Sequence, residues 1–393
     1  MENQPEIRRP QRYVEAFRNS GHSLPESIAD LVDNSIDAGA RNIMVRFVRT
    51  QSSLQQLQVI DDGQGMTEAQ AVDAVRFGRT DYDDTSVTLG MGLPVATASS
   101  AGGLTVISKT RKHGTIGLHW NLEEGSDAMV VERFDPEWAE SHMPMLDSGL
   151  GTLSDSPGTV IQWDRVHDFS RAADRGVDKY LERSFREIRL HLGLHFHRFI
   201  ERGRVNISIC SFDVDTGRNE LTSEVGALDP FGYPEPGRSG YPRPFLLIDK
   251  EHGDLELTAH IWPRNSKLDQ YRLDGTANRQ GLYFYRNDRL LHGGGWCGLR
   301  ADAQPHLSLA RVAIDLPMSW QSVIKSNFAG PGVSVPGHFT EALHAARSVS
   351  GDLSFDTFIK DAELAYRDKG QQAPTVETAD TPEPDIPDGD PLP

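Results

Sequence analysis

The chain is built around one amphipathic segment, Ser27-Ile28-Ala29-Asp30-Leu31-Val32-Asp33-Asn34-Ser35-Ile36-Asp37-Ala38-Gly39-Ala40. Ile28, Leu31 and Val32 recur at the i, i+3, i+4 spacing of a helix that packs one side against a core. Gly39 stands where a helix usually ends. The pattern therefore predicts a helix whose other side carries acidic and amide groups.

Those polar groups need an explanation, because Asp and Asn compete for backbone hydrogen bonds and are commoner at helix ends than inside helices. Asp30 and Asn34 lie four residues apart, so their side chains share one side of successive turns. Asp37 continues this stripe. The simplest explanation is a solvated face, and the alternative is a set of oxygen atoms that holds a hydrated cation and its phosphates.

Three further motifs follow along the chain. A strand at Leu57-Gln58-Val59-Ile60 runs into Asp61-Asp62-Gly63-Gln64-Gly65-Met66, where the glycines let the backbone pass close to a bound ring. Leu89-Gly90-Met91-Gly92-Leu93-Pro94 is a glycine turn, and such a turn at a helix start presents free N–H groups to phosphate oxygens. Gly158-Thr159-Val160-Ile161-Gln162-Trp163 predicts a strand with an early hydroxyl group. Each motif is weak alone, but this order within one domain length favours a nucleotide site.

This order of motifs resembles the GHKL superfamily, which contains gyrase, the heat-shock chaperone ATPases, histidine kinases and MutL. The resemblance implies that Asn34 ligates the Mg²⁺ that bridges the ATP phosphates, and that Asp61 hydrogen-bonds the adenine amino group. Mg²⁺ takes oxygen ligands and keeps several waters, so one asparagine plus phosphates suffices. The residues implied around the nucleotide are Asn34, Asp37, Ala38, Asp61, Gly63, Gly65, Met66, Gly90, Met91, Gly92, Leu93 and Thr159; among these, Gly63 and Gly65 line the adenine pocket, Thr159 backs it, and Gly90 and Gly92 form the phosphate lid.

The chain departs from the family pattern at two positions. The family's general base is a Glu four residues before the asparagine, and Asp30 occupies that position here. Aspartate is shorter by one methylene, about 1.5 Å of reach, and a base must lie within hydrogen-bond distance of the water it activates. We therefore expect ATP binding to survive and hydrolysis to be slow or absent. In the lid, Val87 replaces a common glycine.

Composition limits the remaining options. The formal net charge of −17 excludes a surface that is basic all over, so any nucleic-acid contact must be local. Cys210 and Cys297 are far apart and indicate no disulfide framework. No run of about 18 apolar residues predicts a membrane span, and the first residues lack a hydrophobic signal core. We expect a cytoplasmic protein without a membrane partner.

The second half of the chain supports the resemblance less strongly. The run Arg279-Gln280-Gly281-Leu282-Tyr283-Phe284-Tyr285-Arg286-Asn287-Asp288-Arg289-Leu290-Leu291 is similar to the transducer domain of MORC-type ATPases and their bacterial relatives. In the wider family a lysine of this domain reaches the γ-phosphate, and Lys325 occupies the matching place. A cation there would suit phosphoryl transfer, whereas the alternative is an ordinary surface lysine.

The expected fold class is α+β. We expect an N-terminal Bergerat-type α/β sandwich, a mixed and mostly antiparallel sheet covered by helices, followed by a smaller α/β transducer domain. The expected organisation is an N-terminal arm (1–22), the ATP-binding domain (23–177), a connector helix (178–203), the transducer-like domain (204–345) opening with a strand at 205–209, a helical segment (346–372), and a disordered acidic, Pro-rich tail (373–393).

The resemblance implies an ATP-gated molecular clamp. ATP would bring two protomers together as a homodimer, Lys325 would sense the γ-phosphate, and hydrolysis through Asp30 would reopen the clamp around a protein or nucleic-acid partner. The alternative is a nucleotide-dependent switch or scaffold that does not hydrolyse ATP, because Asp30 replaces the usual Glu. A histidine kinase would need a dimerising helix pair before the ATPase domain, and MutL-type repair a separate C-terminal dimerisation domain, so we expect neither.

Overall fold

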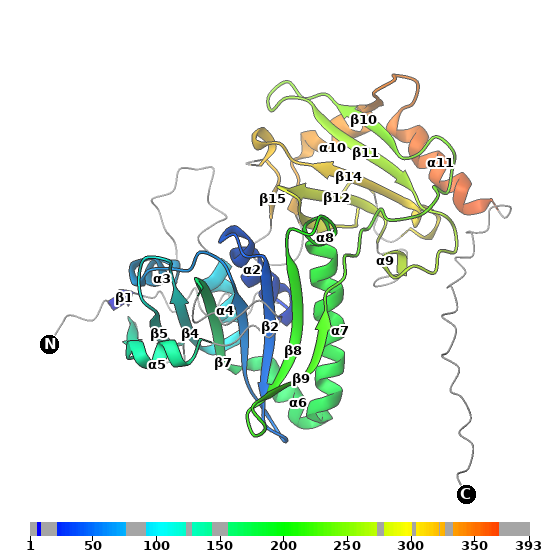
Figure 1. Cartoon of the computed structure of the whole chain (residues 1–393). Helices are drawn as coiled ribbons and strands as arrows, with labels where there is room; N and C mark the ends of the chain where they lie inside the picture. Colours follow the sequence, from blue (N-terminus) through cyan, green and yellow to red (C-terminus); the bar gives the residue numbers. More distant parts are fainter. Residues whose placement is uncertain are drawn as a thin grey trace, which may run out of the picture.

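The computed structural model describes residues 6–8, 22–75, 92–122, 128–143, 156–272, 279–300, 304–321, 323–326 and 333–368. Within these residues the chain forms a nine-stranded sheet followed by a six-stranded sheet, each covered by helices (Figure 1). Both sheets are mixed and mostly antiparallel, because β2 pairs with β8 and β12 with β14 in parallel while the other pairs run antiparallel. The predicted α+β class with a second, smaller sheet is confirmed.

The elements have the following bounds. The first sheet runs in the order β1 (Glu6–Arg8), β6 (Ala128–Arg133), β5 (Ile116–Asn121), β4 (Ala101–Lys109), β7 (Gly158–Val166), β3 (Leu54–Asp61), β2 (Asn42–Arg49), β8 (Asn206–Asp213) and β9 (Arg218–Glu224). The second runs in the order β13 (Arg289–Gly293), β12 (Gly281–Arg286), β14 (Ala310–Asp315), β11 (Leu255–Ile261), β10 (Arg243–Leu247) and β17 (Arg347–Ser348), and β15 (Lys325–Ser326) pairs with β16 (Val333–Ser334). The helices are α2 (Leu24–Asp37), α3 (Glu68–Ala74), α4 (Gly92–Ser100), α5 (Pro136–Ser141), α6 (Ser170–Arg175), α7 (Val177–His195), α8 (His197–Glu201), α9 (Asp269–Arg272), α10 (Gly337–Ala345) and α11 (Phe355–Arg367).

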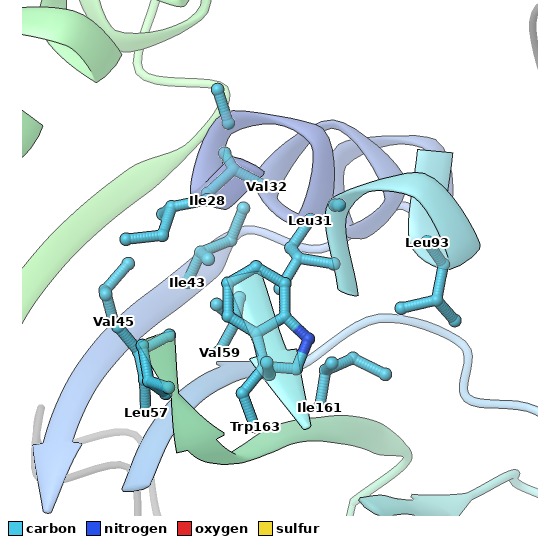
Figure 2. Packing of buried hydrophobic residues seen from close by; sticks show 14 of the residues in the cluster. Ile28, Leu31, Val32, Ile43, Val45, Leu57, Val59, Leu93, Ile161 and Trp163 are labelled. Carbon is cyan, nitrogen blue, oxygen red and sulfur yellow. The ribbon is translucent and has the colours of Figure 1, made fainter. Parts of the chain in front are cut away.

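The central strands of the first sheet are buried on both faces. In β2, Val45 and Phe47 pack into the main core beneath α2 and α7, whereas Met44 joins a smaller cluster on the opposite face, as the two-residue period of a strand requires. Figure 2 shows Ile28 and Leu31 of α2 packed over the labelled strand residues of the main core. The apolar stripe of the opening segment therefore anchors α2 on the sheet.

Helix α2 has clear signals at both ends. Ser23 forms a capping box with Glu26, in which each residue satisfies a backbone N–H of the other. The helix ends at Asp37, and Gly39 follows with φ +77°, a left-handed conformation that suits glycine. The predicted end before Gly39 is confirmed, and the helix begins at Leu24, before the quoted segment, so the polar residues of this segment lie on a well-defined helix.

The second sheet has its own core. Phe245 and Phe284 pack under α10 and α11, through Phe339 and Phe358 among others. Figure 1 places this sheet and its two helices next to the C-terminal end of α7, where α8 begins. The helical segment expected at 346–372 contains α11, whereas Arg347–Ser348 within it form β17, which pairs with β10.

One expected assignment differs from the structure. We expected the strand at 205–209 to open the second domain, but β8 pairs in parallel with β2, and β9 extends the same sheet. The alternating apolar residues of β8 predict a strand, but they do not predict which strand it pairs with. That partner is β2, because the chain passes through α7 and then re-enters the first sheet. The change of sheet therefore occurs between β9 and β10.

Several expectations lie outside the described residues. These are the arm except residues 6–8, the lid positions Val87, Gly90 and Met91, and the acidic tail. Among the helices that the structure describes, none combines the length and the apolar character needed to cross a bilayer.

Candidate functional site

The polar side of α2 carries the first candidate group. Asp30 is partly buried, and Asn34, one turn later, is exposed. Burial raises the pKa of Asp30 from 3.8 to about 7, with further contributions from the nearby charges of Asp33 and Glu26. A carboxyl group with a pKa near neutrality can exchange a proton at physiological pH, which is the property that a general base needs.

Asp61 forms the second group, at the end of β3. Its side chain is 4% exposed; one carboxylate oxygen accepts from the Ser35 hydroxyl and the other from the Gly63 N–H, both at 2.9 Å. Burial raises the pKa of Asp61 to about 6 even though these two hydrogen bonds lower it. The carboxyl group is thus held in a fixed orientation at the buried end of β3, as recognition of a hydrogen-bond donor requires.

A chain of hydroxyl groups extends from Asp61 across the sheet. Thr159 of β7 lies opposite Asp61 in the ladder, and its hydroxyl is 2.8 Å from that of Ser108 on β4. The Ser108 hydroxyl accepts from the Met66 N–H at 2.8 Å. The structure therefore brings together Asp61, Met66 and Thr159, three residues that the resemblance implies around the nucleotide, and adds Ser108 between them.

The two glycines of the 61–66 loop permit close packing of the backbone. A Cβ on Gly63 would lie 2.9 Å from the Cβ of Ala38, and one on Gly65, where φ is +70°, would lie 1.9 Å from the carbonyl oxygen of Lys109. The N–H of Gln64 donates to the carbonyl oxygen of Ala38 at 3.0 Å. This loop is consequently pinned between the end of α2 and the end of β4, so that Ala38, Gly63 and Gly65 lie beside Asp61.

On the remaining side, α4 lies against α2. Gly92 begins α4, and Leu93 is buried in the main core near Leu31 (Figure 2). The Ser27 and Ser99 hydroxyls of the two helices are 3.2 Å apart. The predicted lid position Leu93 therefore contributes a core side chain.

Asp37 has a partner that the sequence did not predict. Arg289, at the start of β13 in the second sheet, forms ion pairs with both Asp33 and Asp37 of α2. The Arg289 side chain is only 18% exposed. Because Asp33 lies three residues after Asp30 and Asp37 three residues after Asn34, the second sheet is tied close to the side of α2 that carries the candidate site.

Lys325 begins β15, a strand that pairs with β16. The guanidinium of Arg286 donates to the carbonyl oxygens of Gln321 and Ile324, at 3.3 and 3.5 Å, and so supports the backbone just before Lys325. The position of the Lys325 side chain lies outside the description, so its role as a γ-phosphate sensor stays a prediction.

The sequence did not identify three residues that contact the candidate site, which are Ser35, Ser108 and Arg289. A serine on the apolar side of α2 is a signal that could have identified Ser35, because a buried hydroxyl needs a partner. Ser108 ends an ordinary strand pattern, and Arg289 follows a hairpin turn far along the chain. Neither has a local signal, because both act through contacts that only the tertiary fold creates.

Comparison with known proteins agrees with this geometry. A family profile described as histidine kinase-, DNA gyrase B-, and HSP90-like ATPase matches residues 22–152. The DNA mismatch repair protein MutL of Dictyoglomus turgidum is 37% identical over 123 residues, and that of Dictyoglomus thermophilum is 35% identical over 123 residues. Each match covers 28% of this chain and 21% of the relative, so the similarity spans about a fifth of the length of these relatives.

A solved structure titled "Crystal Structure of N terminal domain of a DNA repair protein" aligns with 90% of this chain and 97% of its own length, at 16% identity and a TM-score of 0.45. The relatives named here are MutL proteins, and closeness to the MORC-type ATPases stays a prediction. Residues 22–152 thus match the profile of GHKL-type ATPase domains, and the chain shows sequence similarity to MutL over 123 residues.

Proposed function

We propose that the protein binds Mg²⁺–ATP between α2, the 61–66 loop and the start of α4, and hydrolyses it slowly. The observation that carries this proposal is the placement of Asp30 and Asn34 on one side of α2, next to the buried and oriented carboxyl group of Asp61. The donor set suits the ligand: an exposed amide oxygen for a hydrated Mg²⁺, and a fixed carboxylate for an amino group on a flat ring.

Each residue has a separate task in this proposal. Asn34 would hold the Mg²⁺, which neutralises phosphate charge when bound. Asp61 would accept from the adenine amino group, with Thr159 and Met66 beside it. Asp30 would take a proton from the attacking water, and its pKa of about 7 keeps a large fraction of the carboxylate available at neutral pH. Its shorter reach supports a low rate.

The second sheet would make this ATPase a clamp. Arg289 joins β13 to α2, so a change around the nucleotide has a direct mechanical route to the second sheet. In our proposal this sheet serves as a transducer of MORC-like type, Lys325 senses the γ-phosphate, and two ATP-bound protomers close on a protein or nucleic-acid partner. Such a coupling requires only that the two nucleotide states favour different arrangements of the two sheets.

The alternative function is a nucleotide-held switch that does not hydrolyse ATP. One specific observation favours it, which is the aspartate at position 30. In this case ATP would order the site and the second sheet without being consumed. The Asp30 carboxylate would lie too far from the attacking water to take its proton.

Turnover of ATP by the purified full chain with Mg²⁺ separates the two functions. We expect slow turnover by the wild type, and none by Asp30→Asn even though ATP still binds. A wild type that binds ATP without turnover, with hydrolysis appearing in Asp30→Glu, would instead establish the switch. Retained turnover in Asp30→Asn would exclude Asp30 as the base.

A further inference from the structure

His197 begins α8, between the first sheet and the second. It is 2% exposed, and its Nε2 lies 3.1 Å from the hydroxyl oxygen of Tyr285 on β12. Its other ring nitrogen, Nδ1, is buried and has no hydrogen-bond partner. A buried polar atom without a partner is costly and calls for an explanation.

Two carboxylates face this nitrogen. The Oδ1 of Asp229 lies 3.7 Å from Nδ1, and the Oε2 of Glu201 lies 3.9 Å from it. The three atoms lie within 4.8 Å of one another. These distances exceed those of hydrogen bonds, so a nitrogen and two carboxylates converge without a proton shared between them.

Nearby arginines act on the two carboxylates of this cluster without forming ion pairs with them in the described residues. Arg198 and Arg202 are close, but they form ion pairs with Asp315 and Asp288 respectively. In the part of the chain that the structure describes, neither Glu201 nor Asp229 forms an ion pair with a lysine or an arginine.

We propose that His197, Glu201 and Asp229 bind one Zn²⁺-type divalent transition-metal ion. In a tetrahedral site with bonds of about 2.0–2.2 Å the ligand atoms lie about 3.4 Å apart, so Glu201, which is about half exposed, needs to move only slightly. The hydroxyl of Tyr285 can accept from Nε2–H, which leaves the Nδ1 lone pair for the metal, and a metal-bound histidine commonly has such a partner. The imidazole favours Zn²⁺ over Mg²⁺.

A second cluster, Asp249 with His252 and His338, provides a contrast. Oδ1 of Asp249 already accepts from the N–H groups of Glu251 and His252, at 2.9 and 2.7 Å. The turn after Asp249 thus orients its carboxylate, just as the Phe231 N–H orients Oδ1 of Asp229 at 2.9 Å, so the two clusters differ in the buried nitrogen and not in the carboxylate. This second cluster serves as a matched control, because it offers the same ligand types without an unpartnered buried nitrogen.

The proposed metal would brace the junction of the two sheets. Glu201 ends α8, Asp229 precedes β10, and His197 is linked through Tyr285 to β12. Figure 1 shows α8 where α7 meets the second sheet. The site is separate from the proposed ATP site, and it does not depend on whether ATP is hydrolysed.

The test is Zn²⁺ binding by the full chain after removal of metals with EDTA, without nucleotide, measured by competition with a chromophoric chelator. We expect one Zn²⁺ per chain, with an affinity that millimolar Mg²⁺ does not change. Glu201→Gln and Asp229→Asn, two changes that preserve shape, should each weaken binding at least about tenfold. Asp249→Asn should leave it unchanged. Zn²⁺ should also raise the Tm of the wild type and of Asp249→Asn more than that of Glu201→Gln.

Three results would overturn the proposal. The first is the absence of stoichiometric Zn²⁺ binding by the folded wild type. The second is an affinity equal to that of the wild type in Glu201→Gln and in Asp229→Asn. The third is loss of binding in Asp249→Asn. Circular dichroism of the metal-free proteins checks that each variant is folded. Glu201→Gln is the decisive variant, because its partly exposed side chain has no hydrogen-bond partner whose loss would unfold the protein.

Discussion

Replacement of Asp33 by Asn tests whether a neighbouring charge sets the pKa of the proposed base. Asp33 lies one turn from Asp30 on α2, and after burial its charge is the largest cause of the raised pKa of Asp30. The rise from 3.8 to about 7 is about 3 units, or about 4 kcal/mol. Because burial makes the larger contribution, we expect the loss of the Asp33 charge to lower the pKa of Asp30 by about 0.5 to 1 unit.

The assay is the pH dependence of kcat for ATP hydrolysis, together with a carbon-13 NMR titration of the aspartate carboxyl groups. An unprotonated Asp30 is the active form, so activity should rise with pH through about 7 in the wild type and at a lower pH in Asp33→Asn. The NMR titration gives the pKa even if turnover is too slow to measure.

Two variants serve as controls for this experiment. Asp37→Asn also removes a partner of Arg289, but Asp37 is not a cause of the raised pKa of Asp30, so the profile should not move. Glu26→Gln preserves a capping residue and should shift the profile less than Asp33→Asn does. An unchanged pKa in Asp33→Asn, or an equal shift in Asp37→Asn, would refute the assignment.

Three further predictions concern stability. Gly65→Ala should destabilise the fold by about 3 kcal/mol in urea unfolding, because its Cβ would lie 1.9 Å from a backbone oxygen; Gly39→Ala, with a similar φ but no atom within 4 Å, should cost about 1 kcal/mol, and equal costs would contradict this reading. The raised pKa of Asp61 means that the folded chain binds the proton more tightly than the unfolded chain, so this stabilisation is complete below about pH 4 and is lost as pH rises through about 6. Asp61→Asn should therefore reduce the fall in unfolding free energy over this range by up to about 3 kcal/mol, and an unchanged slope would count against it. A double-mutant cycle between Arg289 and Asp37 should give a coupling of about 0.5 to 1 kcal/mol, reduced by salt; zero coupling at low salt would mean that the pair does not hold the second sheet to α2.

The sequence predicted the elements that depend on local pattern. The 3.6-residue period of α2, its end near Gly39 and the mostly apolar run Leu57–Ile60 of β3 were all sufficient to predict helix and strand. These features follow from residue types and short spacings, which a single sequence displays directly.

The missing features depend on long-range contacts. The pairing of β8 with β2 joins residues about 160 positions apart, and the pairing of Arg289 with Asp37 joins residues about 250 apart. Neither pattern contains information on its partner, because a strand or an arginine can serve many partners equally well. The buried state of His197 was equally hidden, since its environment is assembled from α8, β12 and the segment before β10.

Calorimetric titration of ATP into the full chain, with and without Mg²⁺, is the most direct test of the proposed nucleotide site. For the wild type the account predicts one ATP per chain and tighter binding when Mg²⁺ is present. Asn34→Ala should lose most of the gain from Mg²⁺, and Asp61→Asn should weaken binding under both conditions. Absence of ATP binding by the folded wild type, or wild-type binding by both variants, would contradict the account.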